Sequence, residues 1–460
     1  MVESFDVVVI GGGSGLTIVE RALNENLKVA LIEMGPLGGT CLNRGCIPTK
    51  MLIYPADLIR AIEKAGELGV YAKIEKIDHQ KIFNRMRKVV AESSEKSAKA
   101  AEKVKRLKWF RGVGEFIDEY KLKVGYKTIT GEKIFIVSGS RPDIPPIEGL
   151  DKVQYYTSDT ILHINRIPSS LIIIGGGYVS AEYGHFFSSM GCKVSIIHKE
   201  SKVLHYLDSD IVDLFNQEFS KYVNLLTSRT AVKVSVEGEL KKVTCINTKT
   251  NREESFNAEE ILIAAGRRSN SDLLKPELTG VKLTSEGYIQ VNEYLETSKE
   301  NIWAAGDAIG KYMFKHVANY EVEVAWYNSK HGEKIKMDYT AIPAAVFSHP
   351  QIAHVGLTAK EAVEKGFDVV IGTYRFKDVA MGEAMGSPNG LVKIVVNKND
   401  GRILGAQIVG PDATILIQEI VNVMNCQHGS VYNILRALHI HPALPEVVQR
   451  ACANLKEANT

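Results

Sequence analysis

The 460-residue sequence contains no hydrophobic run of the about 20 residues that a membrane-spanning helix needs. Its first residues also lack the basic segment and apolar stretch of a secretory signal. An excess of one charge is missing too, because 56 basic and 54 acidic residues leave a net charge of +2. These absences argue against membrane and nucleic-acid partners. We therefore expect a cytoplasmic protein whose partners are recognised at a local site.

Cysteine is scarce, and only two of the six cysteines, Cys41 and Cys46, lie close together. The others are scattered singly: Cys192, Cys245, Cys426 and Cys452. A zinc site would need a second pair at metal-ligand spacing, so we expect no metal. In a reducing compartment, a disulfide that persists is more often catalytic than structural. The close pair is therefore the first candidate for chemistry, with two unrelated thiols as the alternative.

A disulfide between these cysteines would require an irregular backbone. Residues five positions apart on an ideal helix have Cα atoms roughly 8.6 Å apart. A disulfide requires less than about 7 Å. If Cys41 and Cys46 bridge, the segment must be a distorted turn or irregular helix, and Gly45 and Pro48 supply the bend.

An internal duplication dominates the rest of the chain. Residues 7–33 and residues 171–198 both read as apolar strand, Gly-rich turn, helix and apolar strand. This pattern is typical of the first unit of a parallel, doubly wound sheet, which binds a dinucleotide at the turn. The candidate turn residues are Gly11, Gly13, Ser14 and Gly15 in the first copy and Gly175 and Gly177 in the second. Two copies predict two dinucleotides, and a purely structural turn is the alternative.

The two copies differ at positions that matter for binding. The third glycine of the motif is replaced by Leu16 and by Ser180, and we expect Leu16 to push its helix slightly off the strand. Glu33 ends the second strand of the first copy and is suited to accept hydrogen bonds from a ribose. His198 occupies the equivalent position in the second copy, followed by Lys199.

Three further regions complete the organisation. Residues 55–110 carry a charged, Ala- and Lys-rich pattern that predicts two long helices. Residues 301–307 form a buried strand that ends in Gly-Asp. From about Tyr339 the chain alternates strands and helices without a glycine fingerprint, which predicts a separate α+β domain.

Taken together, these motifs resemble the flavoprotein disulfide reductases, the family of dihydrolipoyl dehydrogenase, glutathione reductase and mercuric reductase. The cysteine run at 38–50 is the most specific motif, and residues 136–142, 263–267 and 343–356 resemble further family segments. The resemblance implies an α/β fold with two doubly wound dinucleotide-binding domains and a C-terminal α+β dimerisation domain. The implied limits are 1–149 and 266–338 for FAD with a central region, 150–265 for NAD(P), and 339–460 for dimerisation.

Within the family, the stretch His439-Ile440-His441-Pro442 with Glu446 is most similar to dihydrolipoyl dehydrogenase, although Ala443 replaces a usual Thr. Mercuric reductases carry a C-terminal cysteine pair, whereas this chain has only Cys452 there. The resemblance therefore implies oxidation of dihydrolipoamide, with electrons passing through the Cys41–Cys46 disulfide and FAD to NAD+. The sequence shows no lipoyl-bearing domain, so we expect the lipoyl group on a separate protein.

The resemblance also implies roles for individual residues. Cys41 exchanges with substrate and Cys46 faces the flavin. His441 is the base and Glu446 orients it, reaching the disulfide of the other subunit of a homodimer; a packed or surface histidine is the alternative. Lys50 lies near the flavin ring with Glu182 as its partner. The implied cofactor contacts are Gly11, Gly13, Ser14, Gly15, Glu33, Thr40, Lys50, Gly139, Gly266 and Asp307 for FAD, and Gly175, Gly177, Tyr178, His198 and Lys199 for the nicotinamide nucleotide.

The nicotinamide specificity stays open between NAD and NADP. Basic residues after the second strand accommodate the extra phosphate of NADP, and His198 is followed by Lys199, Lys202 and His205. Tyr178 also resembles the NADPH-using reductases. The alternative function is therefore an NADPH-dependent reductase of a low-molecular-weight disulfide, with His441 as acid. A non-catalytic flavin-containing sensor is a third hypothesis, against which the intact cysteine pair argues.

Overall fold

The computed structural model describes residues 2–457, so the predicted domain limits at residues 1 and 460 lie outside the described part. The chain divides into two compact units, and each is built from three segments of sequence. Unit 1 comprises Met1–Met51, Phe83–Asp143 and Gly266–Asp338, and unit 2 comprises Leu52–Ile82, Ile144–Ala265 and Tyr339–Thr460. The first Gly-rich turn and the cysteine pair belong to unit 1, and the second turn and the C-terminal region belong to unit 2.

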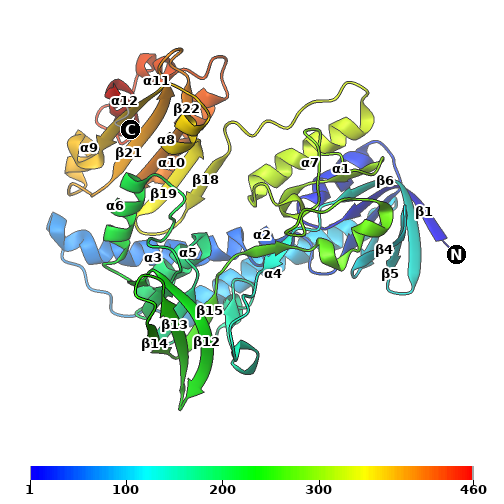
Figure 1. Ribbon diagram of the computed structural model, residues 1–460, viewed down its shortest axis with the longest axis horizontal. Helices are drawn as coiled ribbons and strands as arrows, with labels where there is room; N and C mark the ends of the chain where they lie inside the picture. The colour runs from blue at the N-terminus through cyan, green and yellow to red at the C-terminus, as the bar shows by residue number, and fades with distance from the viewer. Residues whose placement is uncertain (1, 458–460) are drawn as a thin grey trace. The chain divides into compact units, whose positions relative to one another are not determined.

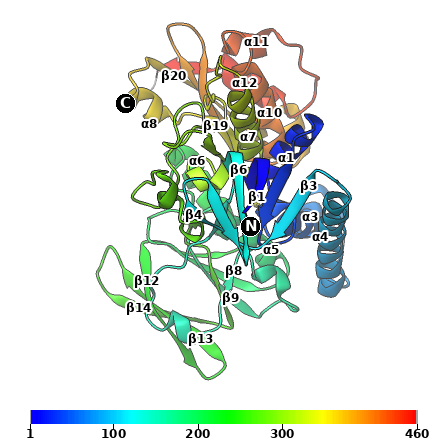
Figure 2. The ribbon, with the colours of Figure 1, turned by 90° about the vertical axis from the view of Figure 1, so that its right-hand side faces the viewer.

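Unit 1 is built on a seven-stranded sheet in the order β3-β2-β1-β6-β5-β4, with β17 also paired to β6 (Figure 2). The strands are β1 (Val2–Ile10), β2 (Val29–Glu33), β3 (Leu107–Arg111), β4 (Gly114–Asp118), β5 (Lys121–Val124), β6 (Lys127–Ile136) and β17 (Ile302–Ala304). β1 pairs in parallel with both β2 and β6. Its apolar run Val7 to Ile10 is at most 3% exposed, as expected for a central parallel strand.

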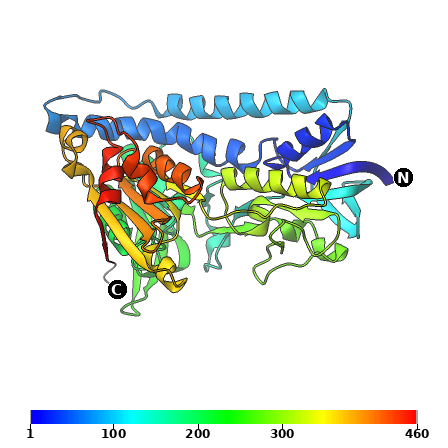
Figure 3. The ribbon, with the colours of Figure 1, turned by 90° about the horizontal axis from the view of Figure 1, so that it is seen from above.

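The helices of the N-terminal half follow the sequence pattern with one correction. They are α1 (Gly15–Asn24), α2 (Gly39–Asn43), α3 (Cys46–Lys64) and α4 (His79–Glu102), and the last two run lengthwise in Figure 3. The two long helices predicted within residues 55–110 correspond to α3 and α4, but α3 already begins at Cys46, α4 ends at Glu102 and residues 107–111 form β3. Pairing with β2 stabilises this segment as an edge strand. Near the end of unit 1, α7 (Lys315–Lys330) packs against α1 (Figure 1).

The middle of the chain supplies two sheets of unit 2. A five-stranded parallel sheet has the order β11-β10-β9-β15-β8, and a three-stranded antiparallel sheet has the order β12-β13-β14. The elements are β8 (Tyr156–Thr157), β9 (Ser170–Ile174), α5 (Tyr178–Ser189), β10 (Lys193–Ile197), α6 (Ser209–Phe219), β11 (Asn224–Leu226), β12 (Arg229–Glu237), β13 (Leu240–Asn247), β14 (Glu253–Ala258) and β15 (Glu260–Ile263). β9 lies between β10 and β15, as β1 lies between β2 and β6.

The C-terminal part of unit 2 is an antiparallel sheet in the order β18-β19-β22-β21-β20-β23, packed against helices. Its strands are β18 (Pro343–Val346), β19 (Gln351–Gly356), β20 (Val369–Arg375), β21 (Leu391–Asn397), β22 (Ile403–Gly410) and β23 (Leu455–Glu457). Its helices are α8 (Ala359–Glu364), α9 (Ala380–Ala384), α10 (Ala413–Met424), α11 (Val431–Arg436) and α12 (Glu446–Ala453). Every residue of β21 and β22 is buried, because helices such as α10 and α12 cover the sheet.

Short elements connect these parts. A two-stranded ribbon in unit 1 joins β7 (Ser140–Pro142) to β16 (Arg267–Ser269). The 3-10 helices are η1 (Ala65–Leu68), η2 (Leu150–Lys152), η3 (Ile161–His163), η4 (Ser271–Leu273), η5 (Pro276–Thr279), η6 (Gly306–Ile309) and η7 (Phe376–Asp378). Between residues 2 and 457, no helix combines the length and apolarity needed to cross a bilayer. The predicted fold class, two doubly wound parts and a C-terminal α+β part, is confirmed.

Candidate redox and dinucleotide sites

The cysteine pair lies where two helices of unit 1 meet. Cys41 is inside α2, and Cys46 is the first residue of α3. Between them the helix is interrupted at Arg44, whose φ of −143° and ψ of 3° are neither helical nor extended. A Cβ at Gly45 would lie 3.1 Å from the Thr40 carbonyl oxygen, so the bend brings the backbone close at this point. The irregular backbone that a bridge requires is therefore present.

In the structure both cysteines are thiols and their side chains are joined by a hydrogen bond. Cys41 is half-buried and Cys46 is exposed. The hydrogen bond to Cys46 raises the pKa of Cys41, and burial raises it further. The positive charge of Lys315 acts in the opposite direction on the same pKa. A thiol of this kind needs nearby positive charge, or a base, before it reacts as a thiolate at neutral pH.

The first Gly-rich turn is closely packed against the strands that it joins. Gly11 has φ +114°, and a Cβ there would lie 2.1 Å from the Val137 carbonyl oxygen. Glu33 accepts hydrogen bonds from the backbone N–H of Gly12 at 2.6 Å and of Gly35 at 2.7 Å. Its carboxylate therefore lies directly beside the turn, where a ribose of a bound dinucleotide is expected.

The helix that follows this turn begins at Gly15, after the N-cap residue Ser14. A Cβ at Gly15 would lie 2.7 Å from Val9 Cγ1, so the helix meets the strand closely at this residue. Leu16 is only half-buried. We therefore assign the close-packing role to Gly15 rather than to residue 16, where the sequence predicted a displaced helix.

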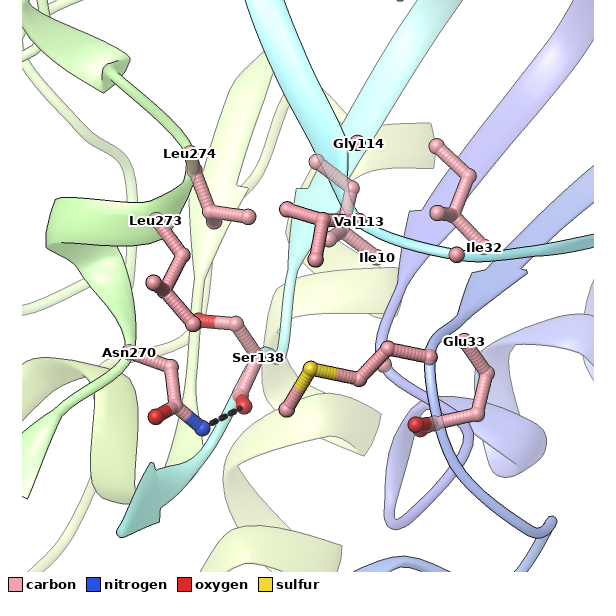
Figure 4. A pocket seen from close by; sticks show the side chains of 12 residues that line it. Ile10, Ile32, Glu33, Val113, Gly114, Ser138, Asn270, Leu273 and Leu274 are labelled. Atoms are coloured by element: carbon pink, nitrogen blue, oxygen red, sulfur yellow. Dashed lines mark hydrogen bonds between the residues drawn. The ribbon is translucent and has the colours of Figure 1, made fainter. Parts of the chain in front are cut away.

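A pocket opens beside Glu33 and encloses about 350 Å³ of empty space, part of it open to solvent (Figure 4). Apolar side chains form much of its wall: Ile10, Ile32, Met34, Val113, Leu273 and Leu274. The buried hydroxyl of Ser138 also lines it, and Oγ has no hydrogen-bond partner among residues 2–457. Flat apolar walls, a carboxylate and an unpaired hydroxyl suit the adenosine part of FAD. The residues present therefore fit this cofactor.

The other predicted flavin contacts of unit 1 lie where segments that are distant in sequence come together. Gly139 and Gly266 both have positive φ, +71° and +139°, with open space where a Cβ would be. Asp307, in η6, accepts a hydrogen bond from Ser140, to which Arg267 Nε also donates at 2.7 Å. Thr40 lies in α2, beside the approach of Gly39 to Gly13, where a Cβ on Gly39 would be 2.7 Å from Gly13 Cα. Lys50 lies one helical turn beyond Cys46.

The second Gly-rich turn, in unit 2, repeats this geometry. Gly175 has φ +131°, and a Cβ there would lie 2.0 Å from the Ala264 carbonyl oxygen. A Cβ at Gly176 would lie 2.4 Å from the ring of His198, so the imidazole covers this turn as Glu33 covers the first. Gly177 caps α5, and the space that a Cβ would occupy there is open, with no neighbouring atom within 4 Å among the described residues.

The charges around the second turn differ from those around the first. Burial, with the neighbouring His205, lowers the pKa of His198 to about 4, so this side chain is neutral at pH 7. Lys199 is exposed, and Lys202 forms an ion pair with Asp213. A neutral imidazole thus stands where the first turn has the Glu33 carboxylate. The second turn therefore lacks the acidic side chain that would favour the ribose of NAD.

Tyr178, the first residue of α5, is held by residues distant in sequence. Its hydroxyl is hydrogen-bonded to His354 Nε2 at 3.0 Å, and its ring stacks on Tyr206 with centroids 5.9 Å apart. Burial lowers the pKa of His354 to about 4, so this histidine is neutral. Burial also raises the pKa of Tyr178. The three side chains form an uncharged aromatic group beside the turn.

The predicted base and its orienting carboxylate are in contact in the C-terminal part of unit 2. His441 Nδ1 lies 3.0 Å from Glu446 Oε1, and Ala443 N–H donates to Glu446 Oε2 at 3.2 Å. The His441 side chain is 72% exposed, whereas that of Glu446 is 11% exposed. The hydrogen bond to His441 lowers the pKa of Glu446, which favours the carboxylate. His441 is thus an oriented imidazole with Nε2 left for chemistry.

Glu182, predicted to pair with Lys50, lies on α5 and accepts a hydrogen bond from the Phe347 N–H at 3.1 Å. Lys50 and Glu182 belong to different units, so their pairing stays a prediction. Sequence reasoning missed Ser138, Lys315 and His354 as site residues, although Ser138 and His354 lie within segments that resemble the family. Among residues 2–457, no group of three or more His, Cys, Asp or Glu side chains is arranged to hold a metal ion.

Comparisons with known proteins find relatives over nearly the whole chain. Mycothione reductase of Mycobacterium tuberculosis is 35% identical over 99% of this chain and 100% of its own length. Dihydrolipoyl dehydrogenase 3 of Haloarcula marismortui is 34% identical over 99% of this chain and 97% of its own. The structure of the HOCl-induced flavoprotein disulfide reductase RclA from Escherichia coli superposes with a TM-score of 0.86 at 27% identity, covering 97% of this chain and 99% of that one.

Two family models match the chain as well. The model for pyridine nucleotide-disulphide oxidoreductases matches residues 5–321, and the model for their dimerisation domain matches residues 342–452. Together they include both Gly-rich turns, the cysteine pair and the His441–Glu446 pair. The chain therefore belongs to the pyridine nucleotide-disulphide oxidoreductases, which bind FAD and a pyridine nucleotide.

Proposed function

We propose that this protein is an NADPH-dependent reductase of a low-molecular-weight disulfide. The general activity, FAD-dependent oxidoreduction between a pyridine nucleotide and a disulfide, follows from the family. The observation that carries the specific proposal is the second Gly-rich turn, where neutral His198 and exposed Lys199 replace the acid that would favour NAD. The full-length similarity to mycothione reductase supports the same direction of reaction. This proposal takes the place of our first expectation, oxidation of dihydrolipoamide.

The chemistry at sulfur follows from the cysteine pair. When bound, FAD would supply a two-electron relay from the reduced nicotinamide, which leaves the Cys41–Cys46 disulfide as a dithiol. The resulting Cys41 thiolate attacks one sulfur of the substrate disulfide, forms a mixed disulfide and releases the first substrate thiol. Cys46 then attacks Cys41 Sγ, which restores the Cys41–Cys46 disulfide and releases the second thiol. NADPH, one proton and one disulfide thus give NADP+ and two thiols.

Each departing thiolate needs a proton, and His441 is our candidate donor. Its contact with Glu446 fixes the ring and stabilises the imidazolium, so Nε2 can give up a proton to the leaving sulfur. Cys41 and His441 belong to different units of the chain. The dimerisation-domain match supports a homodimer in which His441 of the partner subunit serves each dithiol. We propose the cytoplasm as the compartment, because its reducing poise suits this chemistry.

Dihydrolipoyl dehydrogenase is the second candidate. The His439-x-His441-Pro442 stretch with Glu446 favours it, as does the 34% identity to the Haloarcula enzyme. In this case a lipoyl group on a separate protein would be the substrate and NAD+ the acceptor. The two candidate enzymes differ in their nicotinamide nucleotide and in their disulfide substrate, whereas their redox centre is the same.

Steady-state kinetics separate the two candidates. Purified enzyme is assayed with NADPH and with NADH against mycothiol disulfide, glutathione disulfide and lipoamide, and with NAD+ against dihydrolipoamide. We expect kcat/KM to be at least tenfold higher with NADPH than with NADH, and higher with a low-molecular-weight disulfide than with lipoamide. Fast reduction of NAD+ by dihydrolipoamide, with NADPH inactive, would establish the lipoamide enzyme instead. A Cys46→Ser variant that retains FAD and full turnover would overturn both.

A further inference from the structure

Lys315 is an unexpected cation in unit 1. It is the first residue of α7, and its ammonium donates a hydrogen bond to Ser14 Oγ at 2.9 Å. Ser14 is 6% exposed and donates in turn to Asn319 Oδ1 at 2.9 Å. The lysine is thereby held at the N-cap of α1, beside the Gly-rich turn.

This position is electrostatically unfavourable unless an anion is nearby. The N-terminus of a helix carries partial positive charge, so a lysine in the first turn of a 16-residue helix opposes the helix dipole. Lys315 is also half-buried, and burial lowers its pKa. No carboxylate among residues 2–457 forms an ion pair with it, although Asp307 attracts it from farther away.

The other groups that attract the ammonium are sulfurs. Cys41 and Cys46 both favour the charged form of Lys315, and Lys315 in turn favours the thiolate of Cys41. The backbone explains this proximity, because α2, which carries Cys41, approaches the same turn where Gly39 meets Gly13. The half-buried lysine, the turn and the dithiol therefore belong to one site.

We propose that Lys315 is a positioning residue of the redox centre, holding a positive charge beside the Cys41–Cys46 dithiol so that Cys41 reacts as a thiolate. The proposal rests on the proposed function, which makes this pair the redox dithiol. Lys315 acts in addition to His441: the histidine moves protons to and from substrate sulfur, whereas the lysine keeps its proton and acts through its charge.

Alkylation of the reduced holoenzyme tests this role without turnover. The enzyme is reduced anaerobically with NADPH and treated with iodoacetamide at pH 7, and modification of Cys41 is followed by peptide mass. In this reaction the thiolate displaces iodide and forms a carbon–sulfur bond. Removing one nearby positive charge raises a thiol pKa by about one unit. The thiolate fraction then falls about tenfold, but a more basic thiolate is about threefold more nucleophilic. We therefore expect alkylation about threefold slower in Lys315→Met.

Three further variants isolate the charge. Lys315→Gln keeps a donor for Ser14 without charge and is expected to behave like Lys315→Met. Lys315→Arg restores the charge and is expected to restore the rate. Lys330→Met removes the same charge from the other end of α7, roughly 22 Å away along the helix, and should leave the rate unchanged.

The outcomes decide between explanations. Wild-type rates in both Lys315→Met and Lys315→Gln would overturn the proposal, and so would loss of FAD from both, since Lys315 would then serve cofactor binding. A slow rate in Lys330→Met would overturn it too, because net charge would be the cause. If reduced wild-type enzyme shows no reactive Cys41 at all, the proposed function fails instead, independently of Lys315.

Discussion

The two Gly-rich turns share a backbone and differ in the side chain that covers it. In both, the N–H of the first glycine donates to the strand that follows the helix, to Ile32 O at 2.8 Å and to Ile197 O at 2.9 Å. In both, the second glycine has a side chain packed against it, but this side chain is Glu33 in one copy and His198 in the other. Under the proposed function, the backbone would set where a dinucleotide binds, and this side chain would set which dinucleotide it is.

The largest effects are expected when the first glycine of each turn is replaced by alanine. This pair of variants tests whether the two turns bind different nucleotides. Gly11→Ala places Cβ about 2 Å from a carbonyl oxygen at positive φ, which we expect to cost about 3 kcal/mol or more. Gly175→Ala meets the same obstacle at Ala264. We expect Gly11→Ala to purify without FAD, and Gly175→Ala to keep FAD but lose its reduction by NADPH. Flavin absorbance, before and after anaerobic NADPH, measures both.

Gly332→Ala is the matched control, because Gly332 lies outside both turns, does not have a positive φ and has open space at its Cβ among the described residues. It should bind FAD and become reduced as the wild type does. If Gly175→Ala also lost FAD, the two copies would not serve separate nucleotides.

Lowering the pH should reduce the stability of unit 2 more than that of unit 1. Four histidines between residues 2 and 457 have a lowered pKa, and each belongs to unit 2: His79, His198, His349 and His354. The pKa is about 3 for His349 and about 4 for His354, against about 6.5 in the unfolded chain. Below pH 6.5 the unfolded state binds more protons, so the free energy of unfolding falls as the pH falls towards 4.

From pH 7 to pH 5 we expect a loss of up to about 2 kcal/mol for each of these two histidines. Hydrogen exchange, corrected for the intrinsic effect of pH, should show protection falling in peptides of β19 before those of β1. The double variant His349→Gln, His354→Gln should flatten this dependence. Equal loss of protection in both strands, in wild type and variant alike, would contradict the assignment.

Copying the acid of the first turn into the second tests nucleotide choice. In His198→Glu a carboxylate would repel the extra phosphate of NADPH and accept hydrogen bonds from the ribose of NADH. We expect the ratio of kcat/KM for NADPH over NADH to fall about thirtyfold, which corresponds to about 2 kcal/mol. FAD content should not change. An unaltered ratio would mean that His198 takes no part in specificity.

The sequence predicted the parts of these sites that are local and left out those that are not. Both turns, the cysteine pair and the His441–Glu446 pair each lie within one short segment, so local spacing together with the resemblance to the family predicted them. Lys315 is 301 residues from Ser14, and His354 is 176 residues from Tyr178. No periodicity links such residues, because only the folded sheets bring them together. The same holds for the pocket beside Glu33, whose walls come from five separate segments.

The last comparison replaces each of the two side chains that cover the turns, Glu33 and His198, by glutamine. In Glu33→Gln the amide accepts hydrogen bonds less strongly than a carboxylate, both from the turn and from the ribose, so FAD should bind about tenfold more weakly. His198→Gln is the equivalent change in the second turn, where it should alter the KM for NADPH by about twofold at most, because His198 is already neutral. Fluorescence titration of apoenzyme with FAD and steady-state kinetics measure the two effects. Unchanged FAD affinity in Glu33→Gln would mean that the charge of Glu33 contributes nothing beyond its shape.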